Sequence, residues 1–261
     1  MDLGFRGEVT DFYHRYRRGY PPAVVDTLVN AFSLDHDDVV LDVGCGTGQL
    51  TLPLSKHVGV AIGLDPEADM LTRARAAANE DGARNVTWSL GSDEDLTTLH
   101  SLLAPRGFAG ITIAQAAHWM DHDALFRSCV PTLRPGGGLA VVTNGKPLWQ
   151  HDTAWSRALY DVLSTWLGTP PRATCGTDDD SQARYRESLG SAGFTVRTAH
   201  IEYSDELTLE HVIGSVYSAF GANSLPAPDR RPVFEEMVRT ALEPHRPFNE
   251  PVRVGLVIGT R

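Results

Sequence analysis

The sequence predicts an α/β fold: a seven-stranded, mostly parallel sheet with helices on both faces and an additional helical cap. Strand and helix patterns alternate between residues 39 and 144, which is typical of parallel strands joined by helical crossovers. The strand segments are nearly continuous apolar runs, as expected when both faces of a sheet are buried. The last segment, VRVGLVIGT, instead alternates apolar residues at a period of two, which predicts a final strand with one favoured face.

The predicted elements follow one another in a regular order. A helix is expected at 22–32, where PAVVDTLVNAF places apolar residues at helical spacing. Five strands are then expected, at 39–43, 58–65, 85–90, 110–116 and 139–144. The helices predicted between these strands are 49–57, 66–80, 93–103 and 122–133. The second of these helices begins at Pro66, and Glu67 and Asp69 suit the positive end of its dipole.

The pattern changes after residue 145. A Pro-Pro pair and an acidic run predict a solvated loop at 169–181, and 194–204 has the character of a strand. Further helices are expected at 152–167, 182–192, 207–220 and 230–243. The two late strands bring the sheet to seven, and the helices around them could cover its carboxyl edge, where open α/β sheets bind ligands.

The composition limits the class of protein. The 261 residues include 42% hydrophobic residues and carry a formal net charge of −10, so a large core is possible and no basic face dominates. Cys45, Cys129 and Cys175 form no CxxC pattern, which argues against a disulfide framework and a zinc site. No apolar run approaches the ~18 residues of a membrane span, and the N-terminus does not resemble a signal peptide. We therefore expect a cytoplasmic protein that binds neither nucleic acid nor membranes.

Three glycines follow the first predicted strand. In VVLDVGCGTGQL, Gly44, Gly46 and Gly48 permit positive φ angles and allow a ligand to approach backbone N–H groups. The alternative is a tight turn without a ligand. A dinucleotide fingerprint, GxGxxG, fails because Gln49 or Thr51 stands at its sixth position, and the lysine of a phosphate-binding P-loop is absent.

An acidic residue ends the second predicted strand. Asp65 lies 21 residues after Gly44, and a carboxylate at this place can accept hydrogen bonds from both hydroxyls of a ribose. The same side chain could also cap the following helix. The sequence therefore predicts a ligand that has a ribose and lacks a pyrophosphate.

The segments VLDVGCGTGQL and GLDPEADML resemble the first motif and its acidic partner in class I S-adenosylmethionine-dependent methyltransferases, which have a Rossmann-like fold. The resemblance extends to about residue 145. It implies that the glycine loop lies against the methionine part of S-adenosylmethionine and that Asp65 holds the ribose. Asp42 would help to position the loop and the amino group of the cofactor, and Met70 would pack against the adenine.

Two other segments resemble motifs of the same family. LGSDEDL implies that Ser92 and Asp93 lie beside the adenine, with helix capping as the alternative for both. YHRYRRGYPP resembles the YRPGYP element of a bacterial subgroup, which folds over the carboxylate end of the cofactor; an arginine stands where the subgroup has proline. The resemblance implies cofactor contacts from Tyr13, Tyr16 and Arg17, with the Arg17 guanidinium on the carboxylate.

AQAAHWMD, at the end of the fourth predicted strand, resembles the fourth motif of that subgroup. It implies that Gln115 and Ala116 line the path of the methyl group. His118, with an unperturbed pKa of about 6.5, could be a general base, or it could only cap the loop or orient a substrate. An apolar acceptor pocket could be formed in the cap by Trp149, Trp155, Tyr217 and Phe220, which could instead belong to the core. Trp119 is a further expected substrate contact. No metal-binding pattern accompanies these residues, so we expect no metal.

We therefore expect one methyltransferase domain over residues 1–261. Its expected parts are lid helices at 1–35, a cofactor-binding core at 36–145, cap insertions at 146–192 and 205–248, and last strands at 193–204 and 252–260. The expected reaction is methyl transfer from S-adenosylmethionine to a small molecule of bacterial specialised metabolism, with S-adenosylhomocysteine as product. An RNA methyltransferase and a repurposed cofactor-binding protein of the same fold stay open as alternatives, whereas the glycine spacing disfavours an NAD-dependent oxidoreductase.

Overall fold

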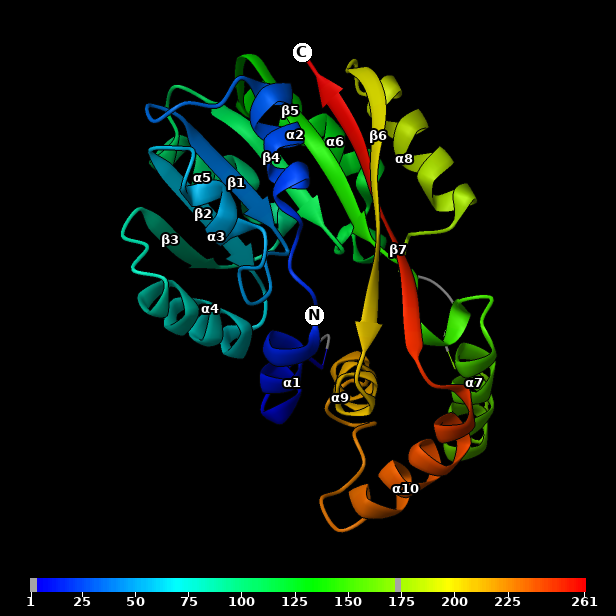
Figure 1. The fold of residues 1–261 in the computed structure, drawn as a ribbon. Helices are drawn as coiled ribbons and strands as arrows, with labels where there is room; N and C mark the ends of the chain where they lie inside the picture. Colours follow the sequence, from blue (N-terminus) through cyan, green and yellow to red (C-terminus); the bar gives the residue numbers. More distant parts are fainter. Residues whose placement is uncertain (1–3, 172–174) are drawn as a thin grey trace.

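A computed structural model describes residues 4–171 and 175–261, and its centre is a seven-stranded sheet with the order β3-β2-β1-β4-β5-β7-β6 (Figure 1). The strands are β1 (Val39–Val43), β2 (Val60–Asp65), β3 (Val86–Leu90), β4 (Phe108–Ala114), β5 (Leu133–Asn144), β6 (Thr195–Leu207) and β7 (Phe248–Thr260). Neighbouring strands among β1 to β5 pair in parallel, whereas β7 is antiparallel to both β5 and β6. The predicted fold class is confirmed.

Helices cover both faces of the sheet and form a cap beyond it. They are α1 (Glu8–Tyr16), α2 (Pro22–Phe32), α3 (Thr51–Ser55), α4 (Ala68–Glu80), α5 (Leu96–Leu103), α6 (His122–Cys129), α7 (Ala154–Leu167), α8 (Asp179–Ser191), α9 (Leu209–Ala219) and α10 (Arg231–Leu242). Short 3-10 turns are η1 (Asp93–Asp95), η2 (Ala117–Trp119), η3 (Val130–Thr132), η4 (Leu148–Gln150) and η5 (Glu243–His245). α2 and α3 bury side chains such as Phe32 and Leu54 on one face of the sheet. α5, α6 and α8 bury side chains such as Phe126 and Leu189 on the other.

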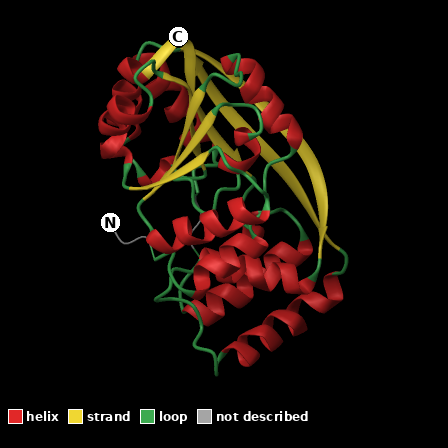
Figure 2. Cartoon of the chain, turned by 90° about the vertical axis from the view of Figure 1, so that its left-hand side faces the viewer, coloured by secondary structure: helices red, strands yellow, loops and turns green. Residues whose placement is uncertain are grey.

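The two longest strands carry a helical cap (Figures 1 and 2). β5 pairs with β7 only as far as Asn144 opposite Val254, whereas β6 and β7 stay paired as far as Leu207 opposite Phe248. Beyond the sheet, α7, α9 and α10 pack around an apolar cluster of their own, and η4, which follows β5, joins the same cluster. The cap therefore stands beside the carboxyl end of β5, and α1 lies against it through α9 (Figure 1).

Two helices pack against the sheet although their residues fall within the predicted cap and lid segments. α8 falls within the predicted cap segment 146–192, but its Tyr185 and Leu189, one turn apart, are buried in the core of the sheet. α2 falls within the predicted lid 1–35, but Phe32 packs on the opposite face of the sheet. Helical periodicity identifies an apolar face without identifying the layer that it contacts. The prediction of a lid then applies only to α1 and the segment that follows it.

Two further findings concern the rest of the chain. Of the loop predicted at 169–181, residues 172–174 lie outside the described residues, and α8 already begins at Asp179. Over residues 4–171 and 175–261, no helix combines the length and the apolar character that crossing a membrane requires.

Candidate active site

The glycine loop connects β1 to α3. Gly44, Gly46 and Gly48 all have positive φ angles, of 70°, 55° and 86°. A Cβ atom on Gly44 would lie 2.5 Å from the Cβ of Ala116, so only glycine lets the ends of β1 and β4 come this close. The Gly44 N–H donates to the Leu64 carbonyl at 2.7 Å, which fastens the loop to β2. The loop is therefore fixed at the carboxyl edge of the sheet, where Gly44 is half-buried and Gly46 and Gly48 are buried.

Asp65, at the end of β2, holds the glycine loop and is itself only 7% exposed. Its Oδ2 accepts the Gly46 N–H at 2.8 Å, and its Oδ1 accepts the Glu67 N–H at 2.9 Å. Each carboxylate oxygen retains a further lone pair, so both hydroxyls of a ribose could still donate to this side chain. Burial raises the pKa of Asp65 to about 6, against the lowering effect of the two backbone N–H groups.

Asp42 lies in β1 beneath the loop and is 1% exposed. It accepts hydrogen bonds from the hydroxyls of Thr51 at 2.6 Å and Thr112 at 2.8 Å, so it ties β1 to α3 and β4. Burial raises its pKa to about 6, although the two hydroxyls lower it. A contact from Asp42 to the amino group of a cofactor stays a prediction. Neither threonine was predicted from the sequence, although Thr112 is a polar residue inside the apolar run GITIA.

α1 brings Tyr13 and Arg17 to the glycine loop. A Cβ atom on Gly46 would lie 3.7 Å from the Tyr13 ring, and the Arg17 guanidinium lies 5.4 Å from the centre of that ring. Desolvation, and after it the charge of Arg17, lowers the pKa of His118 in the turn after β4. The Arg17 Nε is buried without a hydrogen-bond partner among the described residues. This guanidinium is therefore available to an anionic group such as a carboxylate.

Tyr16 has a different environment from Tyr13. Its hydroxyl bonds with Glu210 at 2.9 Å, and its ring occupies the space 2.2 Å from where a Cβ on Gly214 would stand. These contacts hold α1 against α9. They do not support the predicted cofactor contact of Tyr16.

Met70 and Ser92 are two of the residues predicted to contact the adenine. Met70 lies in the first turn of α4 and is 3% exposed. Ser92 caps η1: its hydroxyl accepts the Glu94 N–H at 3.3 Å, and its own N–H donates to Asp95 at 2.9 Å. The capping alternative is thus observed for Ser92, and Asp93, the first residue of η1, remains the predicted adenine contact.

The end of β4 has an unusual backbone. Gln115 is not a glycine, yet its φ angle is 56°, and its N–H is fixed by the Val142 carbonyl at 2.9 Å. Non-glycine residues in this conformation cost free energy and concentrate at functional sites. The next residue, Ala116, is buried against Gly44. Trp119 is 42% exposed, with its ring centre 4.9 Å from that of His118, which leaves an aromatic surface for an acceptor.

His118 is neutral at pH 7. Desolvation of its ring and the charge of Arg17 lower the pKa of His118 to about 4, although the residue as a whole is exposed. The imidazole is therefore in the form that can accept a proton, but it is a weak base. An anion bound at Arg17 would offset the arginine charge and raise the basicity of the ring. The role of general base stays a prediction.

Most of the aromatic residues predicted to line a pocket in the cap are buried in the apolar core of the cap. Tyr217 and Phe220 are 2% and 7% exposed and pack around Phe234, and the Tyr217 hydroxyl lies 3.1 Å from Glu235. Trp149 packs against the same cluster. The core alternative is thus the one observed for Tyr217 and Phe220, and their contacts do not support substrate binding. The reason is that the helical pattern cannot distinguish a side chain in a core from one in a pocket.

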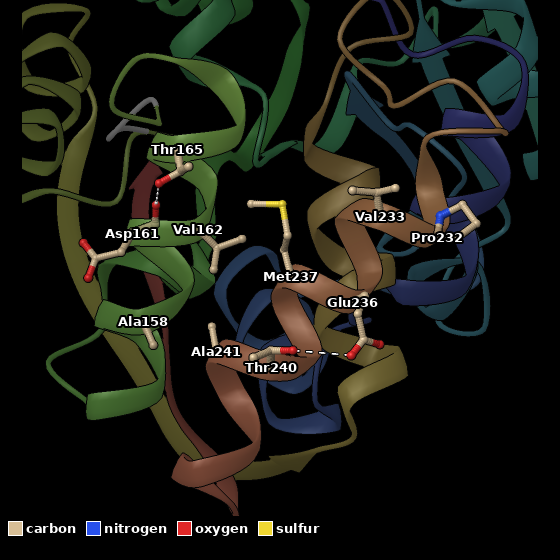
Figure 3. A pocket seen from close by; sticks show the side chains of 10 residues that line it. All are labelled: Ala158, Asp161, Val162, Thr165, Pro232, Val233, Glu236, Met237, Thr240 and Ala241. Atoms are coloured by element: carbon tan, nitrogen blue, oxygen red, sulfur yellow. Dashed lines mark hydrogen bonds between the residues drawn. The ribbon is translucent and has the colours of Figure 1, made fainter.

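A separate groove of about 860 Å³ runs between α7 and α10 (Figure 3). Val162 and Met237 approach one another there from the two helices, flanked by Asp161 and Glu236 (Figure 3). None of the predicted site residues lines this groove, so it does not belong to the glycine-loop site.

Several buried polar atoms at the glycine loop and its lid have no hydrogen-bond partner within the described part of the chain. They are Arg17 Nε, Thr47 Oγ1, Gln49 Nε2 and Gln115 Oε1. Such atoms cost free energy unless a ligand or water satisfies them. A ligand with an amino-acid group and a ribose offers both donors and acceptors along its length, so these residues fit S-adenosylmethionine. Over the described ranges, no three His, Cys, Asp or Glu side chains gather where they could hold a metal ion.

The fold and this site together define a methyltransferase of the class that uses S-adenosylmethionine. Residues 40–137 match the family model described as a methyltransferase domain. An uncharacterised methyltransferase of Mycobacterium tuberculosis is 30% identical over 245 residues, which cover 94% of this chain and 88% of the relative. The chain belongs to the class I S-adenosylmethionine-dependent methyltransferases.

Solved structures share the fold at low sequence identity. The YcgJ protein of Bacillus subtilis has a TM-score of 0.57 at 18% identity and covers 92% of this chain and 99% of its own. The cyclase SpnF has a TM-score of 0.51 at 18% identity, covering 94% of this chain and 84% of its own. The second likeness shows that the same fold also occurs in a cyclase, so the fold alone does not define the reaction.

Proposed function

We propose that the chain transfers the methyl group of S-adenosylmethionine to a small organic acceptor bound between the glycine loop and the cap. One observation carries the proposal: the lid helix α1 lies on the loop, with Tyr13 against Gly46, and is itself held by the cap through α9. A site covered in this way suits an acceptor small enough to be enclosed. The net charge of −10 offers little to an RNA backbone, because RNA binding depends on neutralising phosphates.

Each part of the site has a proposed role. The backbone of the glycine loop and the Arg17 guanidinium would bind the amino-acid end of the cofactor, and Asp65 would accept hydrogen bonds from its ribose. When bound, the cofactor supplies a methyl group that its sulfonium has already activated. The protein then has mainly to align the acceptor, and reacting atoms held about 3–3.5 Å apart recover much of the barrier. His118 would accept the proton of a hydroxyl or amine acceptor.

The acceptor is proposed to be apolar or aromatic and to belong to bacterial specialised metabolism. The exposed Trp119 ring beside His118 supports an apolar acceptor, since an aromatic surface binds such a molecule through its area. No such support comes from Tyr217 or Phe220, which are buried in the cap.

A calorimetric titration with S-adenosylhomocysteine, with NAD and ATP as controls, tests the cofactor. Selective binding in the micromolar range is expected. A transfer assay with labelled S-adenosylmethionine then compares small aromatic acceptors with total RNA. Labelled RNA would overturn the acceptor class, and tight binding without transfer to any acceptor would favour a repurposed protein.

His118→Ala is expected to lower kcat by about 10²–10⁴-fold if the imidazole accepts the proton of the acceptor. Binding of S-adenosylhomocysteine should stay within about twofold of wild type, because no cofactor contact is lost. The control is His200→Ala, which removes an exposed imidazole on β6. A His118→Ala protein with full turnover would exclude the general-base role.

The pKa values of Asp42 and Asp65 predict opposite effects of pH on stability and on binding. Each carboxyl has a pKa of about 6 in the folded protein, above the ordinary value of 3.8, so the folded state holds its proton more tightly. The stabilisation from this source is complete below about pH 3.8 and is lost as the pH rises through about 6. The difference in melting temperature between wild type and Asp65→Asn should therefore shift in favour of wild type from pH 7 to pH 5.

Cofactor binding should change in the other direction. A protonated Asp65 uses one oxygen as a donor and accepts fewer hydrogen bonds from a ribose. The affinity for S-adenosylhomocysteine is therefore expected to fall as the pH drops through about 6, which calorimetry at several pH values measures. An affinity that is constant from pH 5 to pH 7.5 would show that Asp65 is ionised throughout this range or does not contact the ribose.

A further inference from the structure

We infer that Glu250, on β7, positions the Arg17 guanidinium for cofactor binding through a buried contact with Arg18. The inference rests on the proposed function, since it takes Arg17 to bind the carboxylate of the cofactor. Glu250 would touch neither cofactor nor acceptor, so it is a positioning residue.

Glu250 is a charged residue on an otherwise apolar face. Along the part of β7 that extends beyond its pairing with β5, Phe248, Glu250 and Val252 are buried, whereas Asn249 and Pro251 are exposed. Glu250 is 0% exposed. A buried carboxylate is costly unless it is paired and hydrogen-bonded, so its partners indicate why it stands there.

The partners of Glu250 come from the lid segment and from the start of the cap. Its Oε2 accepts a hydrogen bond from Nη2 of Arg18, whereas Nε2 of His151 lies 3.3 Å from its Oε1 without forming a hydrogen bond. Both partner side chains are mostly buried, at 22% and 5% exposure. The next residue of the lid segment is held too, because the Asn144 side chain donates to the Gly19 carbonyl at 3.1 Å. The chain just after Arg17 is thus fastened to β7 and to the end of β5.

This fastening determines the direction of Arg17. The backbone at Arg17 is extended, with φ −78° and ψ 128°. In extended backbone successive side chains point to opposite sides, so an Arg18 fixed on Glu250 directs Arg17 the other way. Arg17 therefore points toward Tyr13, and its guanidinium lies over the Tyr13 ring. The other neighbour of that ring is Gly46 of the glycine loop. Arg17 makes no side-chain hydrogen bond or ion pair of its own among the described residues, so its neighbour supplies the constraint.

Glu250→Gln and Arg18→Ala test the inference with two ligands that differ only at the relevant end. S-adenosylhomocysteine has the amino-acid group, and 5′-methylthioadenosine keeps the adenosine and the sulfur without it. In calorimetric titrations, both variants should lose affinity for S-adenosylhomocysteine on the order of tenfold, as expected for a weakened hydrogen bond to a charged group. Their affinity for 5′-methylthioadenosine should equal that of wild type. Arg18→Lys, which keeps the cation, should recover most of the lost affinity.

Other results would overturn the inference. An equal loss for both ligands would show that the contact only stabilises the fold, and no loss for either would show that Arg17 is positioned without it. If Glu250→Gln fails to fold, Arg18→Ala still allows the two ligands to be compared, because it removes the partly exposed partner of Glu250. The control is Glu236→Gln, which breaks the exposed ion pair with Arg239 on α10 and should leave both affinities unchanged. A wild-type protein that does not bind S-adenosylhomocysteine would instead remove the proposed function.

Discussion

Replacing Asp65 with alanine is expected to weaken the binding of S-adenosylhomocysteine by at least about 100-fold. Hydrogen bonds to a charged group contribute about 1.5–3 kcal/mol each, and two ribose hydroxyls would lose their acceptor; every 1.4 kcal/mol is about tenfold in affinity. The glycine loop would also lose an anchor, because the Asp65 carboxylate accepts the Gly46 N–H at 2.8 Å. Calorimetric titration of wild type and variant measures the difference.

Two further variants make the Asp65 result specific. Asp65→Asn keeps one acceptor oxygen of the same size and place, so its affinity should lie between those of wild type and Asp65→Ala. Asp81→Asn removes a half-exposed carboxylate at the end of α4 and should bind as wild type does. If Asp65→Ala binds S-adenosylhomocysteine as tightly as wild type, Asp65 does not hold the ribose.

The parts of the site that the sequence predicts well are those that depend on local structure. The strand before the glycine loop has the predicted bounds, Val39–Val43, and Asp65 ends β2 as expected. A buried strand, a glycine turn and a helix follow one another directly, so the loop and its position at the sheet edge are contained in a few adjacent residues. In a parallel sheet the ends of neighbouring strands then meet at the same edge, which brings Asp65 to the loop without further information.

The parts of the site that the sequence does not predict are those that depend on which element a helix or strand packs against. Tyr13 and Tyr16 lie one turn apart in α1, yet Tyr13 contacts the glycine loop and Tyr16 contacts α9. Tyr217 belongs to the apolar face of the amphipathic helix α9. The spacing of such a face in the sequence is the same whether the face lines a pocket or a core. Glu250 did carry a signal, a carboxylate on the inward side of a strand of period two, but its partner Arg18 is 232 residues away.

Gly44→Ala is expected to destabilise the protein by about 2–5 kcal/mol and to weaken cofactor binding. A φ of 70° costs an L-residue roughly 1–2 kcal/mol. The new methyl group would also lie 2.5 Å from the Cβ of Ala116, and overpacking of this kind costs about 1–3 kcal/mol more. Relief of the clash would part the ends of β1 and β4, where the loop is proposed to bind the cofactor. Urea denaturation and titration with S-adenosylhomocysteine measure the two effects.

Gly82→Ala separates the two causes of that loss. Gly82 has nearly the same backbone angle, φ 69°, but a Cβ there would meet nothing within 4 Å. Its replacement should therefore cost only the backbone part, roughly 1–2 kcal/mol, and leave binding of S-adenosylhomocysteine unchanged. The excess loss in Gly44→Ala then measures the close approach of β1 and β4. Equal losses of stability in the two variants would mean that the backbone conformation alone requires glycine at position 44, and that the strand ends can separate without cost.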